Sequence, residues 1–451
     1  MPLETFIDAI LHSSATNVLR SHASGRLPVR HILSIMHIIH IDCNAFFASC
    51  EVSLRPDLRG KPVVVANCNE AGGGVILALT KEAKALRLKR GDPVFKVKNV
   101  LNQHNVAVFP ASHSKYSNIS RQLMQAVREQ DIVLNFTQYS VDEFFGALPL
   151  EDKDELKETA SKVKAHIEQS TGIPVSCGLA TTYTLAKVAT WYAKHYNGYG
   201  GICVLPKEKV EVALKGMPIT DLWGIGRRTA PRLVYLNINT ALDLYSLDEH
   251  EVRRLLNING VRTWKELHGI PAINIDRLSR QKSIVHSHTF AFMTSDKTQL
   301  HTYIADYAMA AARKLRDQHS VCQGVSVFLC TNRFREDLEQ YDCFETEKLR
   351  VASADSIVIT NAAAQALERI YLPGFQYKRA GVVLSDITSD EAIQLDLFSN
   401  DAPNLEKSRK LMSAVDNLTD RYGMGAIKLG SQQTDKPETD ISNIQPPQTN
   451  S

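Results

Sequence analysis

The sequence predicts a multidomain α/β protein, and three observations support this prediction. At 451 residues the chain is too long for one compact core. Strand-like and helical patterns alternate from about residue 36 to 200, and short helices joined by turns follow to residue 277. Residues 284–388 mix both patterns again. We therefore expect several domains, each with a core of its own.

The first region alternates short apolar strands with helices. The strand-like runs are 37–43, 62–67, 132–139, 144–148 and 175–180, and the helical patterns are 79–90, 114–129, 152–170 and 182–195. Grouping the runs that flank the acidic residues gives a βαββαβ, ferredoxin-like unit. A small region, roughly 46–112, is inserted into it.

The later part of the chain is less regular. Within 284–388 we expect strands at 283–292, 324–330 and 380–384 and helices at 299–318 and 355–370. After Asp390 the chain becomes polar, with a helical stretch near 405–422, and residues 431–451 should be disordered. Residues 1–35 are weakly patterned, so we expect an extension that reflects a mis-assigned start or disorder.

One segment, Tyr139–Gly146, carries two adjacent carboxylates, Asp142 and Glu143, between apolar strand-like runs. Carboxylates in apolar surroundings are costly unless they are paired or bound to a metal ion. A polar hairpin tip is an equally good interpretation of this segment alone.

A second segment favours the metal interpretation. The run 37–43 is an apolar strand whose end carries Asp42, and a helix follows with Asn44 as a plausible N-cap. Together the segments supply three carboxylates, and Mg²⁺ is typically held by a few carboxylates plus substrate phosphates. Two such ions can activate the attacking oxygen and stabilise the leaving oxygen in nucleotidyl transfer.

These segments and several others resemble one family in the same order along the chain. The resembling stretches are Asp42–Glu51, Arg55–Val65, Glu82–Leu86, Ser140–Glu143 and Trp223–Arg228. They resemble Y-family, translesion DNA polymerases, and most of all the UmuC-type catalytic subunit of the bacterial SOS mutagenic polymerase. The resemblance runs from about Met36 to Gly430.

The resemblance implies a polymerase whose domains are arranged like a right hand, and it gives names to these domains. The palm would comprise 36–45 and 113–200, the fingers 46–112, the helical thumb 201–277 and the little finger 284–388. The remaining residues, 389–451, would form a C-terminal region with a clamp-binding peptide and a disordered tail.

The implied activity is error-prone addition of deoxynucleotides to a primer opposite damaged template, in SOS-type repair and mutagenesis. Asp42, Asp142 and Glu143 would be the catalytic residues, and they would hold two Mg²⁺ ions together with the Cys43 backbone carbonyl.

The resemblance also implies residues that bind the incoming nucleotide. They are Phe46, Phe47, Lys84, Tyr116 and Lys187. Phe47 matches the steric gate, an aromatic ring that would collide with a ribose 2′-hydroxyl, whereas Phe46 would act through its backbone. The chain departs from the family pattern at Lys81 and Tyr183, so phosphate contacts could be looser.

DNA contacts are expected in the thumb. Leu222–Leu233 resembles a helix-hairpin-helix, in which Gly224 and Gly226 would bring backbone N–H groups to DNA phosphates. Arg227 and Arg228 would add positive charge there. The overall net charge of +3 says little about nucleic-acid binding, but bases exceed acids locally in 81–98 and 187–232.

The resemblance implies further partners. The peptide Gln394, Leu395, Asp396, Leu397, Phe398 resembles the motif that bacterial polymerases insert into the sliding clamp. We expect primer–template DNA, dNTPs, the clamp, a UmuD′-like accessory subunit and the recombinase (RecA) filament as partners. The eight scattered cysteines and the lack of a long apolar run indicate a cytoplasmic protein, nucleoid-associated when on DNA.

Two alternatives stay open at this point. A nucleotidyl cyclase on a similar palm would carry the same acids, but it would leave the hairpin motif and the clamp peptide unexplained. A degenerate, clamp-tethered DNA-binding subunit would explain the changes at Lys81 and Tyr183, although the three intact carboxylates argue against it.

Overall fold

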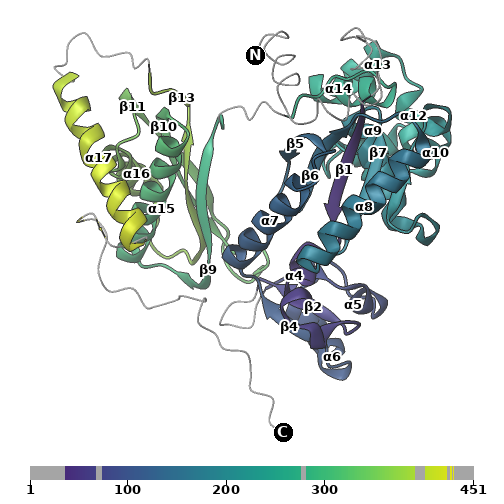
Figure 1. The fold of residues 1–451 in the computed structure, drawn as a ribbon. Coiled ribbons are helices and arrows are strands. Elements are labelled where there is room, and N and C mark those ends of the chain that lie inside the picture. Colours follow the sequence, from purple (N-terminus) through teal and green to yellow (C-terminus); the bar gives the residue numbers. More distant parts are fainter. Residues whose placement is uncertain are drawn as a thin grey trace. The chain divides into compact units, whose positions relative to one another are not determined.

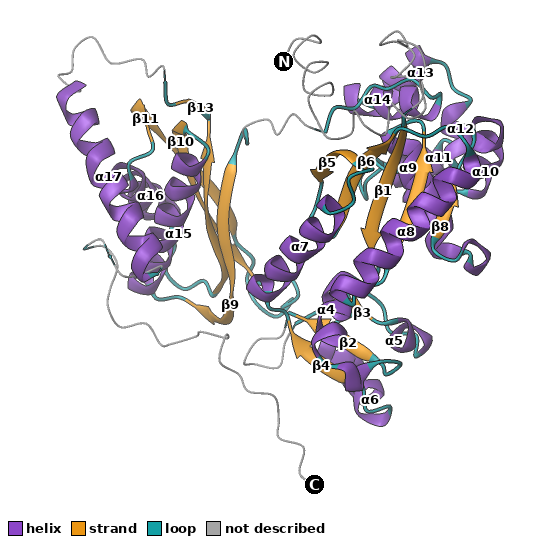
Figure 2. Cartoon of the chain, viewed as in Figure 1, coloured by secondary structure: helices purple, strands orange, loops and turns teal. Residues whose placement is uncertain are grey.

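The computed structural model describes residues 36–67, 74–275, 281–391, 402–423, 427–428 and 430. The chain separates into two compact units whose boundary falls between Arg277 and Leu278 (Figure 1). Both units mix helices and strands, as Figure 2 shows, and each is considered by itself below.

A five-stranded sheet in the order β5-β6-β1-β7-β8 forms the centre of the first unit. Its strands are β1 His37–Cys43, β5 Leu134–Gln138, β6 Glu143–Leu148, β7 Val175–Ala180 and β8 Ile202–Val204. The middle strand, β1, pairs antiparallel with both β6 and β7. The predicted strands are confirmed, and the short strand β8 was missed.

The two faces of β1 meet different helices because side chains alternate along a strand. Ile39, Ile41 and Cys43 are buried in a core that includes residues of α7 (His113–Arg128) and α8 (Lys153–Thr171). His40 and Asp42 instead contact α9 (Tyr183–His195). The sheet is therefore covered on both faces, and its polar positions face α9.

A smaller sheet in the order β3-β2-β4 lies within the range predicted for the fingers. Its elements are α4 Phe46–Leu54, the 3-10 turn Pro56–Leu58, β2 Val63–Ala66, β3 Ile76–Leu79, α5 Lys81–Ala85, α6 Val94–Gln103 and β4 Ala107–Pro110. The helix predicted at 79–90 is shorter in the structure. Thr80 caps its start, and Arg87 adopts a left-handed φ of 64° that a helix cannot continue through.

Short helices joined by turns complete the first unit, as the sequence predicts. They are the 3-10 turns Asn197–Tyr199, Lys207–Lys209 and Ile219–Asp221 and the α-helices α10 Val210–Gly216, α11 Ala230–Tyr235, α12 Ala241–Tyr245, α13 Glu249–Leu255 and α14 Ile258–Leu267. Capping boxes start α12 at Thr240 and α13 at Asp248. Their core also contains residues of α9, so α9 links these helices to the sheet.

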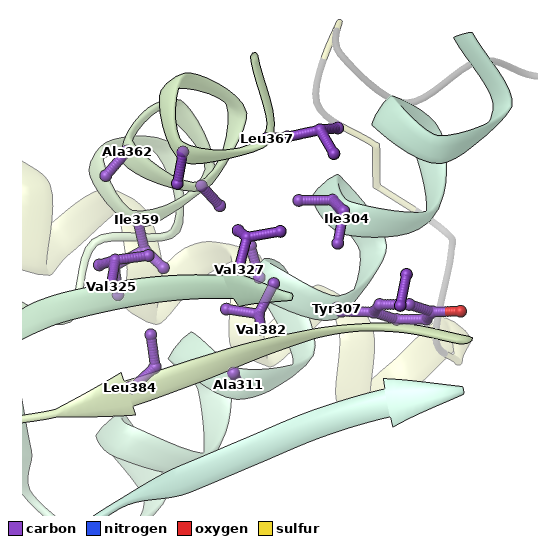
Figure 3. Packing of buried hydrophobic residues seen from close by; sticks show 14 of the residues in the cluster. Ile304, Tyr307, Ala311, Val325, Val327, Ile359, Ala362, Leu367, Val382 and Leu384 are labelled. Carbon is purple, nitrogen blue, oxygen red and sulfur yellow. The ribbon is translucent and has the colours of Figure 1, made fainter. Parts of the chain in front are cut away.

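The second unit is an antiparallel sheet backed by helices. The sheet has the order β11-β10-β12-β9, and β13 pairs with β10. The elements are β9 Ile284–Thr294, α15 Lys297–Asp317, β10 Ser320–Thr331, β11 Asp342–Ser353, α16 Ser356–Ile370, β12 Tyr377–Ser385, β13 Thr388–Ser389 and α17 Ala402–Tyr422. Figure 3 shows Ile304 and Ile359 packing with Val327 and Val382 in its core.

The described part of the chain also bears on membrane-spanning helices and on the state of the cysteines. No helix there is long and apolar enough to cross a membrane. The cysteines described are free thiols, and most of them are buried.

Candidate active site

Two neighbouring strands present the predicted acids side by side. Asp42 on β1 lies opposite Glu143 on β6 in the antiparallel register. The Cys43 amide donates a hydrogen bond of 2.9 Å to the Asp142 carbonyl oxygen. The structure therefore brings all three predicted carboxylate residues to one end of β1.

Asp142 lies at the tip of the hairpin that joins β5 to β6. The amides of Tyr139 and Ser140 donate to the Glu143 carbonyl oxygen at 3.0 and 3.1 Å. The Ser140 hydroxyl donates to the Asp142 carboxylate at 2.8 Å. The segment is thus a polar hairpin tip that lies beside Asp42, and metal binding by its two carboxylates stays a prediction.

Helix α9 places two lysines against these acids. Lys187 Nζ donates to the two carboxylate oxygens of Glu143 at 3.0 and 3.1 Å, and Lys194 forms an ion pair with Asp42. The two lysines are two helical turns apart and so share one face of α9. Burial raises the pKa of Asp42 to about 6, while the positive charge of Lys194 acts in the opposite direction.

Besides Asp42, β1 presents a second polar side chain, His40, to α9. Its Nδ1 lies 2.8 Å from Thr190 Oγ1, and its Nε2 lies 3.9 Å from Glu143 Oε1. Burial, followed by the charges of Lys187 and Lys194, holds the pKa of His40 well below its usual value. The ligand atoms of His40, Asp42 and Glu143 lie within 4.8 Å of one another.

A cavity of about 200 Å³ opens beside these groups, between β1 and α9. Its wall includes Trp191 and Trp223 besides the acids and lysines already named. The ammonium group of Lys187 also lies 4.8 Å from the ring centre of Tyr139 and 5.0 Å from that of Trp223. Lys187 was predicted to bind substrate phosphate, but here it is enclosed by aromatic rings and bonded to Glu143.

The donor set fits a hard divalent cation. Asp42, Asp142 and Glu143 offer carboxylate oxygens from one strand end and one hairpin, which are the ligands that Mg²⁺ prefers. The ammonium groups of Lys187 and Lys194 now occupy positions where a cation would balance Glu143 and Asp42. The Cys43 side chain is buried, so only its backbone carbonyl can serve as a ligand.

Phe47, the predicted steric gate, lies in the first turn of α4. Its ring stacks on Tyr116 of α7, with ring centres 4.5 Å apart and planes inclined by 20°. Tyr116 is 1% exposed and supports Phe47 from behind, while its predicted contact with the nucleotide stays a prediction. Phe46 is buried as well, in keeping with a role limited to its backbone.

The start of α4 differs from the sequence prediction. Ala45, with a left-handed φ of 49°, is the N-cap residue, and no side chain caps the helix there. Asn44 is therefore not the N-cap. Its side-chain oxygen instead accepts a hydrogen bond from Ser176 on β7 at 3.0 Å, which joins the start of the helix to the sheet.

The other predicted contacts lie on exposed turns. Lys84 is exposed on α5, next to the buried Ala83. In the hairpin motif, Gly224 has a φ of 91° that favours glycine, and Gly226, Arg227 and Arg228 are exposed. Pro231 lies in the first turn of α11, where a helix tolerates proline because the N–H has no partner within the helix. The clamp-type peptide Gln394–Phe398 lies outside the described residues.

Sequence reasoning missed two members of the site. Lys194 could have been found from its spacing to Lys187, because residues two turns apart share a helix face. His40 carried no such signal, since its contact with α9 exists only once the helix covers the sheet. A histidine in an apolar strand is more often a buried structural residue than a functional one.

Comparison with known proteins places this geometry in one family. Residues 41–191 match the impB/mucB/samB family and residues 281–397 its C-terminal domain. Structural similarity identifies the fold: a Y-family DNA polymerase chimera superposes with a TM-score of 0.61 at 22% identity, covering 78% of this chain and 99% of that chain. The fold is therefore that of Y-family DNA polymerases.

Sequence similarity identifies the family. Protein UmuC of Salmonella typhimurium is 34% identical over 397 residues, which cover 87% of this chain and 92% of that protein. Protein MucB of Escherichia coli is 33% identical over 88% of this chain and 93% of its own length. DNA polymerase IV 1 of Bacillus subtilis is 28% identical over 87% and 92%. The chain belongs to the impB/mucB/samB family.

Proposed function

We propose that this chain is an error-prone translesion DNA polymerase of the UmuC type. It adds deoxynucleotides to a primer opposite damaged template, as a DNA-directed nucleotidyltransferase. The observation that carries the proposal is the register of β1 and β6, which sets Asp42 against Glu143 beside Asp142 at the end of the sheet. Relatives named UmuC, MucB and DNA polymerase IV match most of the chain, which supports the same activity.

The metal ligands follow from the donor set. Asp42, Asp142 and Glu143 would hold two Mg²⁺ ions, with the Cys43 carbonyl as a further ligand. When bound, the ions lower the pKa of the primer 3′-hydroxyl and neutralise charge on the departing pyrophosphate. The role of the protein is to fix the carboxylates, because β1 is the central strand of the sheet and cannot shift without disturbing both neighbours.

The lysines of α9 then have a second role. Once cations balance Asp42 and Glu143, the ammonium groups of Lys194 and Lys187 are free to turn toward substrate phosphates. Lys194 is the better placed of the two, because its side chain is 30% exposed and that of Lys187 only 15%. Lys84 on α5 would add a further positive charge on the triphosphate, as a point charge rather than a bidentate fork.

DNA and sugar recognition use the remaining predicted residues. Phe47 would exclude the ribose 2′-hydroxyl by collision. The turn at Gly224–Arg228 would hold the DNA backbone without reading its sequence, since the exposed groups there are backbone amides and guanidinium groups. The Gln394–Phe398 peptide would bind the sliding clamp. A UmuD′-like subunit and the recombinase (RecA) filament are the other proposed partners.

Primer extension on undamaged and abasic templates tests this proposal. The wild-type chain, with accessory proteins supplied in one arm, should extend the primer, and Asp42→Asn should not. Asp152→Asn is a matched control, because Asp152 caps α8 away from the site and should retain activity. DNA binding without extension would favour the noncatalytic alternative, and a cyclic nucleotide formed without primer would favour the cyclase.

A further inference from the structure

A buried carboxylate lies behind the predicted steric gate. Glu51 ends the second turn of α4, and its side chain is only 1% exposed. Its Oε1 accepts a hydrogen bond from the Tyr116 hydroxyl at 2.9 Å. Lys115 Nζ donates to both oxygens of the same carboxylate, at 3.1 and 3.3 Å. Within the described part of the chain, the hydrogen bonds to this carboxylate come from two consecutive residues of α7.

This arrangement fixes the ring on which Phe47 rests. Tyr116 is held at its hydroxyl end by Glu51, and its ring face stacks on Phe47. The ring of His113, one turn earlier on α7, meets Phe47 edge-on at 5.7 Å. Phe47 therefore has support on two sides, and the Tyr116 side depends on a charge-assisted hydrogen bond, which is stronger than a neutral one.

We infer that Glu51 is a positioning residue for sugar discrimination and acts through Tyr116. This inference rests on the proposed function of Phe47 as the gate. The ring of Phe47 excludes a 2′-hydroxyl only if the ribonucleotide cannot push the ring aside. A ring packed against a fixed neighbour is displaced less easily than a ring packed against a mobile one. Glu51 and Tyr116 therefore set how strongly ribonucleotides are rejected, although Glu51 itself touches no nucleotide.

A buried carboxylate could instead have a purely structural role, so the test must measure more than activity. The readout is the ratio of kcat/KM for a dNTP to that for the matching rNTP. A general loss of stability or of active enzyme lowers both values together and leaves the ratio unchanged. A displaced gate ring changes the ratio, because only the ribonucleotide meets the ring.

Two variants alter the same hydrogen bond from opposite ends. Tyr116→Phe keeps the ring and deletes the donor hydroxyl, and Glu51→Gln keeps the side-chain shape and replaces the charged acceptor with a neutral amide oxygen, which is a weaker acceptor. We expect each to lower the discrimination ratio about tenfold, the effect of losing a hydrogen bond to a charged group. The double variant should be close to either single variant, since both act through one bond.

Glu266→Gln is the matched control. Glu266 is equally buried in the first unit and also accepts several hydrogen bonds, from the amides of Thr184, Ala272 and Ile273. Its hydrogen-bond donors lie on α9 and after α14, and not on α4 or α7, so its loss should lower stability and leave the discrimination ratio as in the wild type. Thermal unfolding of each variant shows whether it is folded, and Tyr116→Phe retains the test if Glu51→Gln does not fold.

The outcomes separate this inference from the proposed function. Failure of the wild type to extend a primer, or an unchanged ratio in Phe47→Ala, would refute the proposed function. A changed ratio in Phe47→Ala together with unchanged ratios in Glu51→Gln and Tyr116→Phe would overturn the role of Glu51 alone. An equal change in Glu266→Gln would overturn it too, because buried carboxylates in general would then produce the effect.

Discussion

Lys194 on α9 forms an ion pair with Asp42 on β1, so a helix and the central strand meet at the candidate metal site. Lys187 forms a similar ion pair with Glu143, so one face of α9 carries the positive charges that pair with both acids. The sheet therefore supplies the acids of the site and α9 supplies its lysines. Substitutions in the two groups of residues can be tested separately.

Loss of the metal ligands should abolish catalysis while sparing DNA binding. Asp42→Asn and Asp142→Asn should each lower kcat by about a thousandfold or more, because the charge that holds the ions is lost and the binding surface is not. Primer extension and a DNA mobility-shift assay measure the two effects. Substantial extension by either variant would refute the proposed mechanism.

Lys194→Ala should weaken use of the incoming nucleotide. We expect kcat/KM for dNTP to fall about tenfold to a hundredfold, because a cation that can reach the triphosphate is removed. Lys162→Ala on α8 is a suitable control, since its ammonium group forms only an exposed helix pair with Glu158. Equal kinetics in the two variants would leave Lys194 as a structural partner of Asp42.

Phe47→Ala should admit ribonucleotides. Without the ring, the space beside the sugar is open, and incorporation of ribonucleotides relative to deoxynucleotides should rise by about a hundredfold or more. Single-nucleotide insertion with matched dNTP and rNTP gives the ratio. If the ratio stays at the wild-type value, Phe47 is a core aromatic residue and the gate lies elsewhere.

Gly178→Ala should destabilise the first unit. A Cβ at this position of β7 would lie 2.2 Å from the Thr190 amide nitrogen and 2.3 Å from the Ala186 carbonyl oxygen, both in the backbone of α9. The helix would have to move away from the sheet, at a cost of about 3 kcal/mol or more. Chemical denaturation measures the loss, and Gly198→Ala, whose Cβ meets nothing within 4 Å, is the control.

Binding of the peptide Gln394–Phe398 to the sliding clamp can be tested by substitution. Leu397→Ala combined with Phe398→Ala should spare basal extension on short primers and remove stimulation by the clamp, because a few apolar side chains carry most of such an affinity. Extension with and without the clamp is the measurement. Stimulation equal to that of the wild type would mean that the clamp contact lies elsewhere in the chain.

The sequence predicted most of the regular elements that bury an apolar face. The strands at 37–43 and 175–180 match their predicted ends, and the helices at 114–129 and 152–170 differ by one residue at each end. The short strands at 76–79, 107–110 and 202–204 escaped prediction, because three or four residues carry too little periodicity. The strand at 342–353 was also missed, because its charged residues occupy both faces and hide the alternation of apolar and polar positions.

The candidate site was predicted in part. Asp42, Asp142, Glu143 and Phe47 stood in recognisable local motifs, and the structure brings the acids together. The contacts of Lys194, His40 and Glu51 depend on how α9 and α7 pack on the sheet and on α4, which no local pattern reveals. Tyr116 fitted a motif, and the structure adds that it is buried behind Phe47, which the motif did not indicate.

The paired lysines have one more consequence. Carboxylates gathered at a strand end would repel one another in the folded chain if nothing balanced them, and proteins with such clusters often require a bound ion to stay folded. Here the counterions are part of the polypeptide, at Lys187 and Lys194. We therefore expect the first unit to stay folded when divalent cations are removed, because the lysines already balance Asp42 and Glu143.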